Sequence, residues 1–249
     1  MQCLHKGWFR MSNSRGFVVK SIKNGETSMI VSCYLDDIGL QSFIVKGVYG
    51  TKKNKFTKAH FFPLNFISIN YSVSKTGRLG YIKEVKPLKL YKSLHSNVEK
   101  SAVIIFLSEI LNSIFKEEGE ENKNLFNFLD RSLNWYDNQK SCNNFHIKFL
   151  IELTRYIGFY PNIRSEKDKF FNLESGSSSS IKPMSKSIDF DDYYLFKQLL
   201  GMKFEDLNSM EINKNSRLRL LNHIIDYYSL HLQMFKSPKS IDILSEVFK

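Results

Sequence analysis

The chemically informative residues of this chain are lysines interspersed with aromatic residues in its first third. The first 90 residues contain 15 Lys and Arg against four acids, Glu26, Asp36, Asp37 and Glu84. The other 159 residues are neutral, so the whole net charge of +11 belongs to this segment. A folded region with that excess needs an anionic partner, usually a phosphate backbone. A membrane surface or a heparin-like polymer would satisfy the same charge.

This composition predicts nucleic-acid binding by charge and stacking, because lysines neutralise phosphates while exposed aromatic rings stack on bases. The basic candidates are Lys20, Lys46, Lys52, Lys53, Lys55, Lys58, Arg78 and Lys83. The aromatic candidates are Tyr34, Tyr49, Phe56 and Tyr81. A single Lys could be an ordinary surface charge and a single ring could belong to a core. The prediction therefore depends on the excess of the group.

The sequence offers no constellation for catalysis. The Gly-rich phosphate loop and the dinucleotide fingerprint are both absent, and the six His do not stand at metal-ligand spacing. Asp36 and Asp37 come at the end of an expected strand, where a role in a turn is usual. The acids between Glu117 and Glu121 are expected to be a solvated helix end. We therefore expect a binding protein without metal or cofactor, rather than an enzyme.

Three widely spaced cysteines give neither a disulfide framework nor a metal-ligand pattern, which favours a reducing cytoplasm. No apolar run approaches the roughly 20 residues of a membrane span. The N-terminus lacks the pattern of a secretory signal, and Met11 is a plausible second start site. Residues 1–11 are expected to be a disordered extension.

The residues from Arg15 to about Val85 alternate with period two between turns rich in Gly and Asn. This pattern predicts five antiparallel strands. A longer connection, 47–60, separates the third strand from the fourth. Five short strands with such a connection favour a small Greek-key barrel of the oligonucleotide-binding (OB) kind, although an SH3-like barrel would give a similar pattern.

After about residue 95 the period becomes helical, beginning with a Ser96 to Glu99 capping box. Helices are expected over 96–116, 124–138, 143–158, 192–200 and 216–234, with a short one after 240. Residues 162–190 are polar and include the serine tract Ser177–Ser180, which predicts a mobile loop. The predicted class is α+β, with an OB barrel over 12–90 and an all-α domain over 91–249.

Several segments resemble the RecO family of DNA repair proteins, closest to its Bacteroidetes-type members. Their order and spacing make the resemblance specific, and it spans about residues 12–249. The resembling segments are Arg15–Val31, Gly39–Val48, Phe145–Pro161, Phe170–Gly176, Asp226–Leu232 and Lys239–Leu244.

The resemblance implies a non-catalytic recombination mediator of the RecF pathway that works in the cytoplasm on nucleoid DNA. Such proteins bind single- and double-stranded DNA, anneal complementary strands and engage the C-terminal tail of single-strand-binding protein (SSB). They work with RecR to help load RecA. Many members hold zinc through two Cys pairs in the loop after the central helix. Here that loop, 162–190, contains no cysteine, so the expectation is no metal site.

The resemblance also places an SSB-tail pocket around the central helix, 143–158. Such a tail is acidic and ends in Pro-Phe with a free carboxylate, so its pocket needs an apolar slot and a cation. The helical period puts Phe149 on the apolar face and Lys148 and Arg155 off it. Lys148 is the expected cation and Arg155 the second, while Phe149 belongs either to the slot or to the core.

Two other functions fit the same residues. The barrel could bind RNA and act as an RNA chaperone, because a basic, aromatic surface does not by itself distinguish the two nucleic acids. Alternatively, the helical domain could be an interaction scaffold to which the barrel only adds adhesion.

Overall fold

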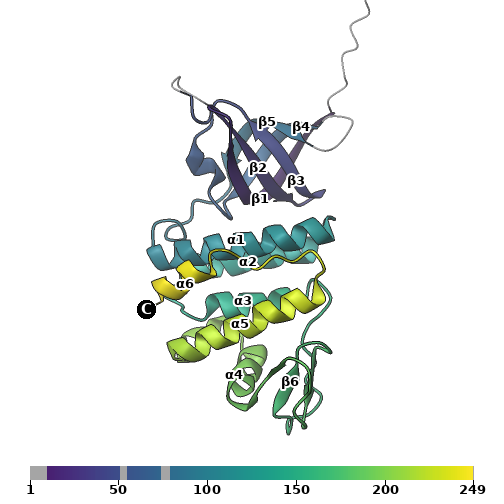
Figure 1. Cartoon of the computed structure of the whole chain (residues 1–249). Coiled ribbons are helices and arrows are strands. Elements are labelled where there is room, and N and C mark those ends of the chain that lie inside the picture. The colour runs from purple at the N-terminus through teal and green to yellow at the C-terminus, as the bar shows by residue number, and fades with distance from the viewer. Residues whose placement is uncertain (1–9, 51–54, 74–78, 249) are drawn as a thin grey trace, which may run out of the picture. The chain divides into compact units, whose positions relative to one another are not determined.

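The computed structural model describes residues 10–50, 55–73 and 79–248. Contacts divide them into two units, one formed by residues up to 91 together with 119–123, the other by 92–118 and 124 onward (Figure 1). The first unit contains strands β1 (Arg10–Asn24), β2 (Ser28–Leu35), β3 (Gly39–Val45), β4 (Phe66–Val73) and β5 (Gly80–Pro87), with the short 3-10 helix η1 (Lys58–Phe61). The strand and helix classes predicted from the two periodicities are confirmed.

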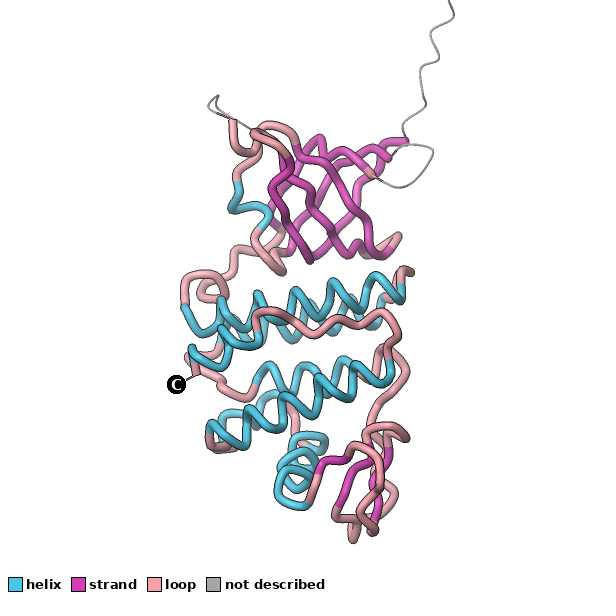
Figure 2. The backbone as a smooth tube through the Cα atoms, viewed as in Figure 1, coloured by secondary structure: helices cyan, strands magenta, loops and turns pink. Residues whose placement is uncertain are grey.

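The described strands close into a five-stranded barrel in the order β1-β2-β3-β5-β4, which Figure 2 shows in magenta. Strand β1 is long enough to pair with β4 through its first half and with β2 through its second half. A bulge between Val18 and Lys20 lets it turn from one partner to the other. Parallel pairing of Phe43 with Gly80 closes the barrel. This is the OB topology, so the predicted fold class is confirmed.

The barrel core follows the predicted alternation. Val31, Cys33 and Leu35 point inward and are fully buried. The turn after β2 holds Asp36, which binds Arg15, and Asp37, which accepts a hydrogen bond from Ser14, so these acids serve the turn as predicted. Burial of Cys33 in this core raises the pKa of its thiol to about 12.

The second unit contains the helices α1 (Val98–Glu118), α2 (Lys123–Asn138), α3 (Phe145–Leu153), α4 (Phe190–Gly201), α5 (Lys214–His231) and α6 (Ile241–Val247), with the 3-10 helix η2 (Phe204–Ser209). Helix α1 is buried along most of its length. Its expected capping box is wrong. Asn97 accepts the hydrogen bond from the backbone N–H of Lys100, because the Ser96 hydroxyl donates to the carbonyl of Lys92 instead.

The segment 162–190, expected as a mobile loop, contains a small sheet of β6 (Phe170–Asn172), β7 (Ser177–Ser179) and β8 (Ser187–Ile188). Phe171 in its central strand is fully buried against Phe196 of α4 and Tyr227 of α5. Gly176 has a positive φ of 62°, and a Cβ there would lie 2.7 Å from the Tyr227 hydroxyl, so only glycine fits this turn. Its mobility stays a prediction.

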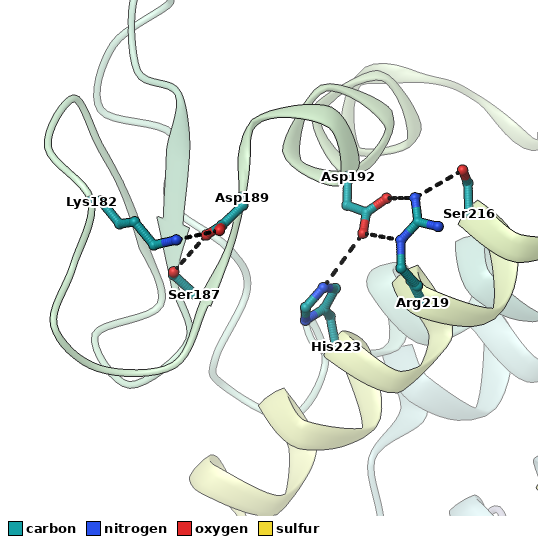
Figure 3. A network of polar contacts seen from close by, with 7 residues as sticks. All are labelled: Lys182, Ser187, Asp189, Asp192, Ser216, Arg219 and His223. Atoms are coloured by element: carbon teal, nitrogen blue, oxygen red, sulfur yellow. Dashed lines mark hydrogen bonds and ion pairs between the residues drawn. The ribbon is translucent and has the colours of Figure 1, made fainter.

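Helix α4 is fixed to α5 by a buried carboxylate (Figure 3). Asp192 accepts two hydrogen bonds of 2.9 Å from Arg219 and lies 3.6 Å from His223. Asp189, next to the start of α4, accepts from Lys182 and Ser187, which ties the β7–β8 loop to the helix. Bidentate pairing of this kind defines the position of a helix as well as stabilising it. The position of α4 matters because a carbonyl group at its C-terminal end accepts a hydrogen bond from Lys148 of α3.

Candidate functional site

The barrel brings two of the expected lysines, Lys46 and Lys58, over aromatic rings. The Lys58 ammonium lies 4.5 Å from the ring centroid of Tyr49, and Lys23 approaches the same ring at 5.5 Å. Lys46 lies 5.5 Å from the ring of Tyr81, which is partly exposed. Cations held in this way present a positioned charge, which suits a phosphate, while the ring of Tyr49 also packs on the barrel core and is partly covered.

Sequence reasoning did not select Lys23. Its position next to the Asn24-Gly25 turn at the end of β1 was the available signal, because such a turn leaves the flanking side chains exposed. Lys20 and Lys83 are exposed on β1 and β5. The remaining basic candidates Lys52, Lys53 and Arg78 lie outside the described residues.

Two other candidates have partners within the barrel. Lys55 forms a 3.0 Å ion pair with Glu84, which lowers the pKa of that carboxyl group through the hydrogen bond and the charge of Lys55. Phe56 packs on the barrel core and lies 6.4 Å from Phe61, so part of its ring area is already covered. Tyr34 is only 2% exposed, and its hydroxyl accepts the backbone N–H of Asn122. Its ring is therefore not available to a base.

The second unit holds an aromatic pocket of about 340 Å³ against α3. One face of α2 supplies Phe128, Arg131 and Trp135, spaced three or four residues apart. Phe128 stacks on Tyr156 at 4.8 Å, and Trp135 lies 5.6 Å from Phe204. The remaining lining residues are Ser132, Lys148, Glu152, Met202, Lys203 and Glu205. Sequence reasoning missed the α2 and η2 contributions, because residues some 10 to 60 positions from α3 meet it only in the folded chain.

The structure places Lys148 in the pocket wall rather than on an exposed face. Its side chain is 2% exposed, and its ammonium donates to Glu152 Oε1 at 2.6 Å and to the carbonyl of Leu199 at 2.9 Å. Burial lowers the pKa of Lys148, and Glu152 opposes this shift. Helix α3 is buried all round, so the expected polar side at Lys148 is wrong. The carbonyls at the C-terminus of α4 are what allow a cation to be buried there.

Arg155 is half exposed and shares the same carboxylate. Its Nε lies 3.3 Å from Glu152 Oε2, and its guanidinium stacks on Tyr160 at 3.8 Å. Phe149 is fully buried, 5.0 Å from Phe128, and lies behind the wall without lining the pocket. Of the expected tail-binding residues, the fold therefore brings Lys148 and Arg155 together through Glu152 and assigns Phe149 to the core.

Neither a metal site nor a membrane span is found in the part of the chain that the structure describes. No group of three or more His, Cys, Asp or Glu there could hold a metal ion, and the residues of 162–190 do not fit a zinc site. None of the helices there is both long and apolar enough to cross a bilayer.

The fold and these two sites define a class, the OB-fold proteins that carry a basic barrel and a helical domain in one chain. The family models for the N-terminal and C-terminal parts of recombination protein O match residues 10–91 and 95–240. This chain belongs to the RecO family, which assigns it to DNA repair and recombination. The resemblance seen in the sequence is confirmed.

The similar proteins are alike over nearly their whole length. A DNA repair protein RecO of Flavobacterium psychrophilum is 38% identical over 235 residues, covering 94% of this chain and 98% of that protein. Proteins of the same name from Flavobacterium johnsoniae and Bacteroides fragilis are each 35% identical, covering 94% of this chain and 98% and 97% of their own lengths.

Proposed function

We propose that this protein binds single- and double-stranded DNA through its barrel, anneals complementary strands and, with RecR and SSB, promotes RecA loading. The observation that carries the proposal is the location of the charge. The whole excess of +11 lies in the first 90 residues, most of which form the barrel, and lysines there stand over aromatic rings. Annealing then needs no catalytic group, because a positive surface lowers the repulsion between two strands and concentrates them.

The test is annealing of complementary strands coated with SSB, with and without the last residues of the SSB tail. Tail-dependent acceleration is the expected result. Acceleration of naked strands alone would leave a basic annealing protein without SSB capture. The absence of acceleration on either substrate would contradict the proposal, and competition between DNA and RNA of equal length would then test the RNA reading.

We propose that the SSB tail binds at the aromatic pocket of the second unit. The pocket offers an apolar slot between Phe128, Trp135 and Phe204, as a terminal Phe requires. Arg131 and Lys203 line the pocket, and Arg155 lies beside the pocket in an ion pair with Glu152. These cations suit the acidic residues and the terminal carboxylate of the tail.

Arg155→Glu is expected to weaken binding of the SSB tail peptide about tenfold or more, because it replaces an exposed attraction by a repulsion. Arg155 is preferable to Lys148 for this test, since a glutamate at 148 would face buried carbonyls and Glu152. Peptide affinity is measured by fluorescence anisotropy. Arg164→Glu, an exposed change of equal charge outside the pocket, is the control. Equal peptide affinity in both variants would exclude Arg155 from the site.

A further inference from the structure

Glu152 in the wall of the aromatic pocket binds two cations, Lys148 in the same wall and Arg155 beside the pocket. Glu152 Oε1 accepts from Lys148 at 2.6 Å, and Glu152 Oε2 lies 3.3 Å from Arg155 Nε. Among the residues that the structure describes, no other carboxylate forms an ion pair with either cation. The three side chains therefore carry a net charge of +1, and the cluster attracts a second anion.

The exposure of the three groups differs in a way that favours exchange. Lys148 is 2% exposed, Glu152 is 17% exposed and Arg155 is 52% exposed. The Lys148 ammonium cannot leave, because it is also held by the carbonyl of Leu199. Glu152 can turn toward solvent at modest cost, since a carboxylate regains its hydration there. Another carboxylate could then compensate the buried cation that it leaves.

We propose that Glu152 is a built-in competitor that occupies the place of an incoming peptide carboxylate, so that capture of a peptide tail at this pocket is a carboxylate exchange. This inference rests on the proposed tail binding. The incoming carboxylate displaces Glu152 from Arg155 and Lys148, while the terminal aromatic ring enters the slot beside Phe128 and Trp135.

The exchange gives the pocket selectivity. An internal acidic side chain brings a carboxylate but no ring, and it gains little by replacing Glu152. An aromatic residue with a blocked terminus brings a ring but leaves Glu152 in place. A terminal Phe with a free carboxylate supplies both, so its ring contacts offset the displacement of Glu152. Competition by Glu152 also keeps binding weak enough for the tail to be released.

The test compares two peptides and two proteins. The probe is an acidic peptide that ends in Pro-Phe, made with a free C-terminal carboxylate and with a C-terminal amide. Glu152→Gln keeps the shape of the side chain and one acceptor for Lys148, but it removes the competing charge. The variant is expected to bind the free-acid peptide about tenfold more tightly than the wild type, and the amidated peptide with less than about a twofold change.

Two further variants separate this effect from a general change of charge. Glu174→Gln alters an exposed acid in the β6–β7 turn and is expected to leave both affinities unchanged. Glu205→Gln removes an acid that lines the pocket without an ion pair to either cation, so a gain smaller than that of Glu152→Gln is expected for both peptides. If Glu152→Gln does not fold, Glu152→Asp is the alternative, because it keeps a carboxylate near Lys148 but shortens its reach to Arg155. A smaller increase in affinity is then expected, for the free-acid peptide alone.

The outcomes separate the inference from the proposed function. A wild type that binds the peptide while Glu152→Gln binds it equally or more weakly would overturn the exchange and leave tail capture intact. An equal gain for both peptides would likewise overturn it, because the carboxylate would not be what competes. If neither protein binds the peptide, tail capture itself fails, and the exchange fails with it.

Discussion

Replacing Lys46, Lys58 and Lys83 together by Gln is expected to lower the affinity for single-stranded DNA about 100-fold at 0.1 M salt. Each phosphate contact with a single strand contributes about 0.7 to the slope of log affinity against log salt. Between 1 M and 0.1 M salt, this slope corresponds to about a fivefold gain in affinity for each contact. The loss of three contacts therefore lowers the affinity at 0.1 M salt about 100-fold. The three lysines are exposed on the barrel, and two of them stand over aromatic rings.

The measurement is fluorescence anisotropy of a labelled oligonucleotide over a salt series, where the slope should become less steep by about 2. The matched control replaces three exposed lysines of the second unit, Lys140, Lys167 and Lys239, by Gln. The control has the same change of net charge. Equal losses in the two triple variants would show that affinity follows total charge, which would contradict a site on the barrel.

Lowering the pH from 7 to 4.5 is expected to reduce the free energy of unfolding about 2.7 kcal/mol more in the wild type than in His146→Leu. His146 is 1% exposed, its Nδ1 has no hydrogen-bond partner among the described residues, and its ring stacks on Phe248 at 5.5 Å. Burial, helped by the charge of Arg217, lowers the pKa of His146 from 6.5 to about 3.

The direction of the effect follows from proton binding. Above pH 6.5 His146 is neutral in both states and contributes no pH dependence. Below pH 6.5 the unfolded chain takes up a proton that the folded protein refuses, so stability falls by about 1.36 kcal/mol for each pH unit until the folded pKa is reached. Urea unfolding of both proteins at the two pH values measures the difference. A constant difference between them would mean that the folded state accepts the proton.

The sequence was sufficient for the types and order of the barrel strands and of the helices, but it missed the small sheet of β6, β7 and β8. Alternation at Val31, Cys33 and Leu35 identified a strand with one buried face, and the change to helical spacing after residue 95 marked the second domain. These patterns are local, since each depends on how neighbouring residues share a face. The charge of the barrel is a matter of composition and needed no structure. Strand number and the length of one connection favoured the OB topology, and the family resemblance was needed to prefer it to an SH3-like barrel.

Tyr34 and Lys148 mark where local reasoning failed. By alternation Tyr34 should face outward from β2, yet it is buried, and its hydroxyl binds the backbone of Asn122 from far along the chain. Helical spacing put Lys148 on a polar side, yet the C-terminus of α4 covers it. In both cases the covering group lies about 50 or more residues away, beyond the reach of any periodic pattern.

The sequence by itself determined that this protein has a strongly basic OB barrel followed by a neutral helical domain of the RecO family. Only the tertiary structure decided which lysines stand over which rings, and which residues of α2 and η2 complete the aromatic pocket. It also decided that Glu152 joins Lys148 to Arg155. The physical reason is that the type of an element depends on neighbours along the chain, whereas a site is assembled from distant segments. The burial of those segments determines how strongly each charged group interacts with its partners.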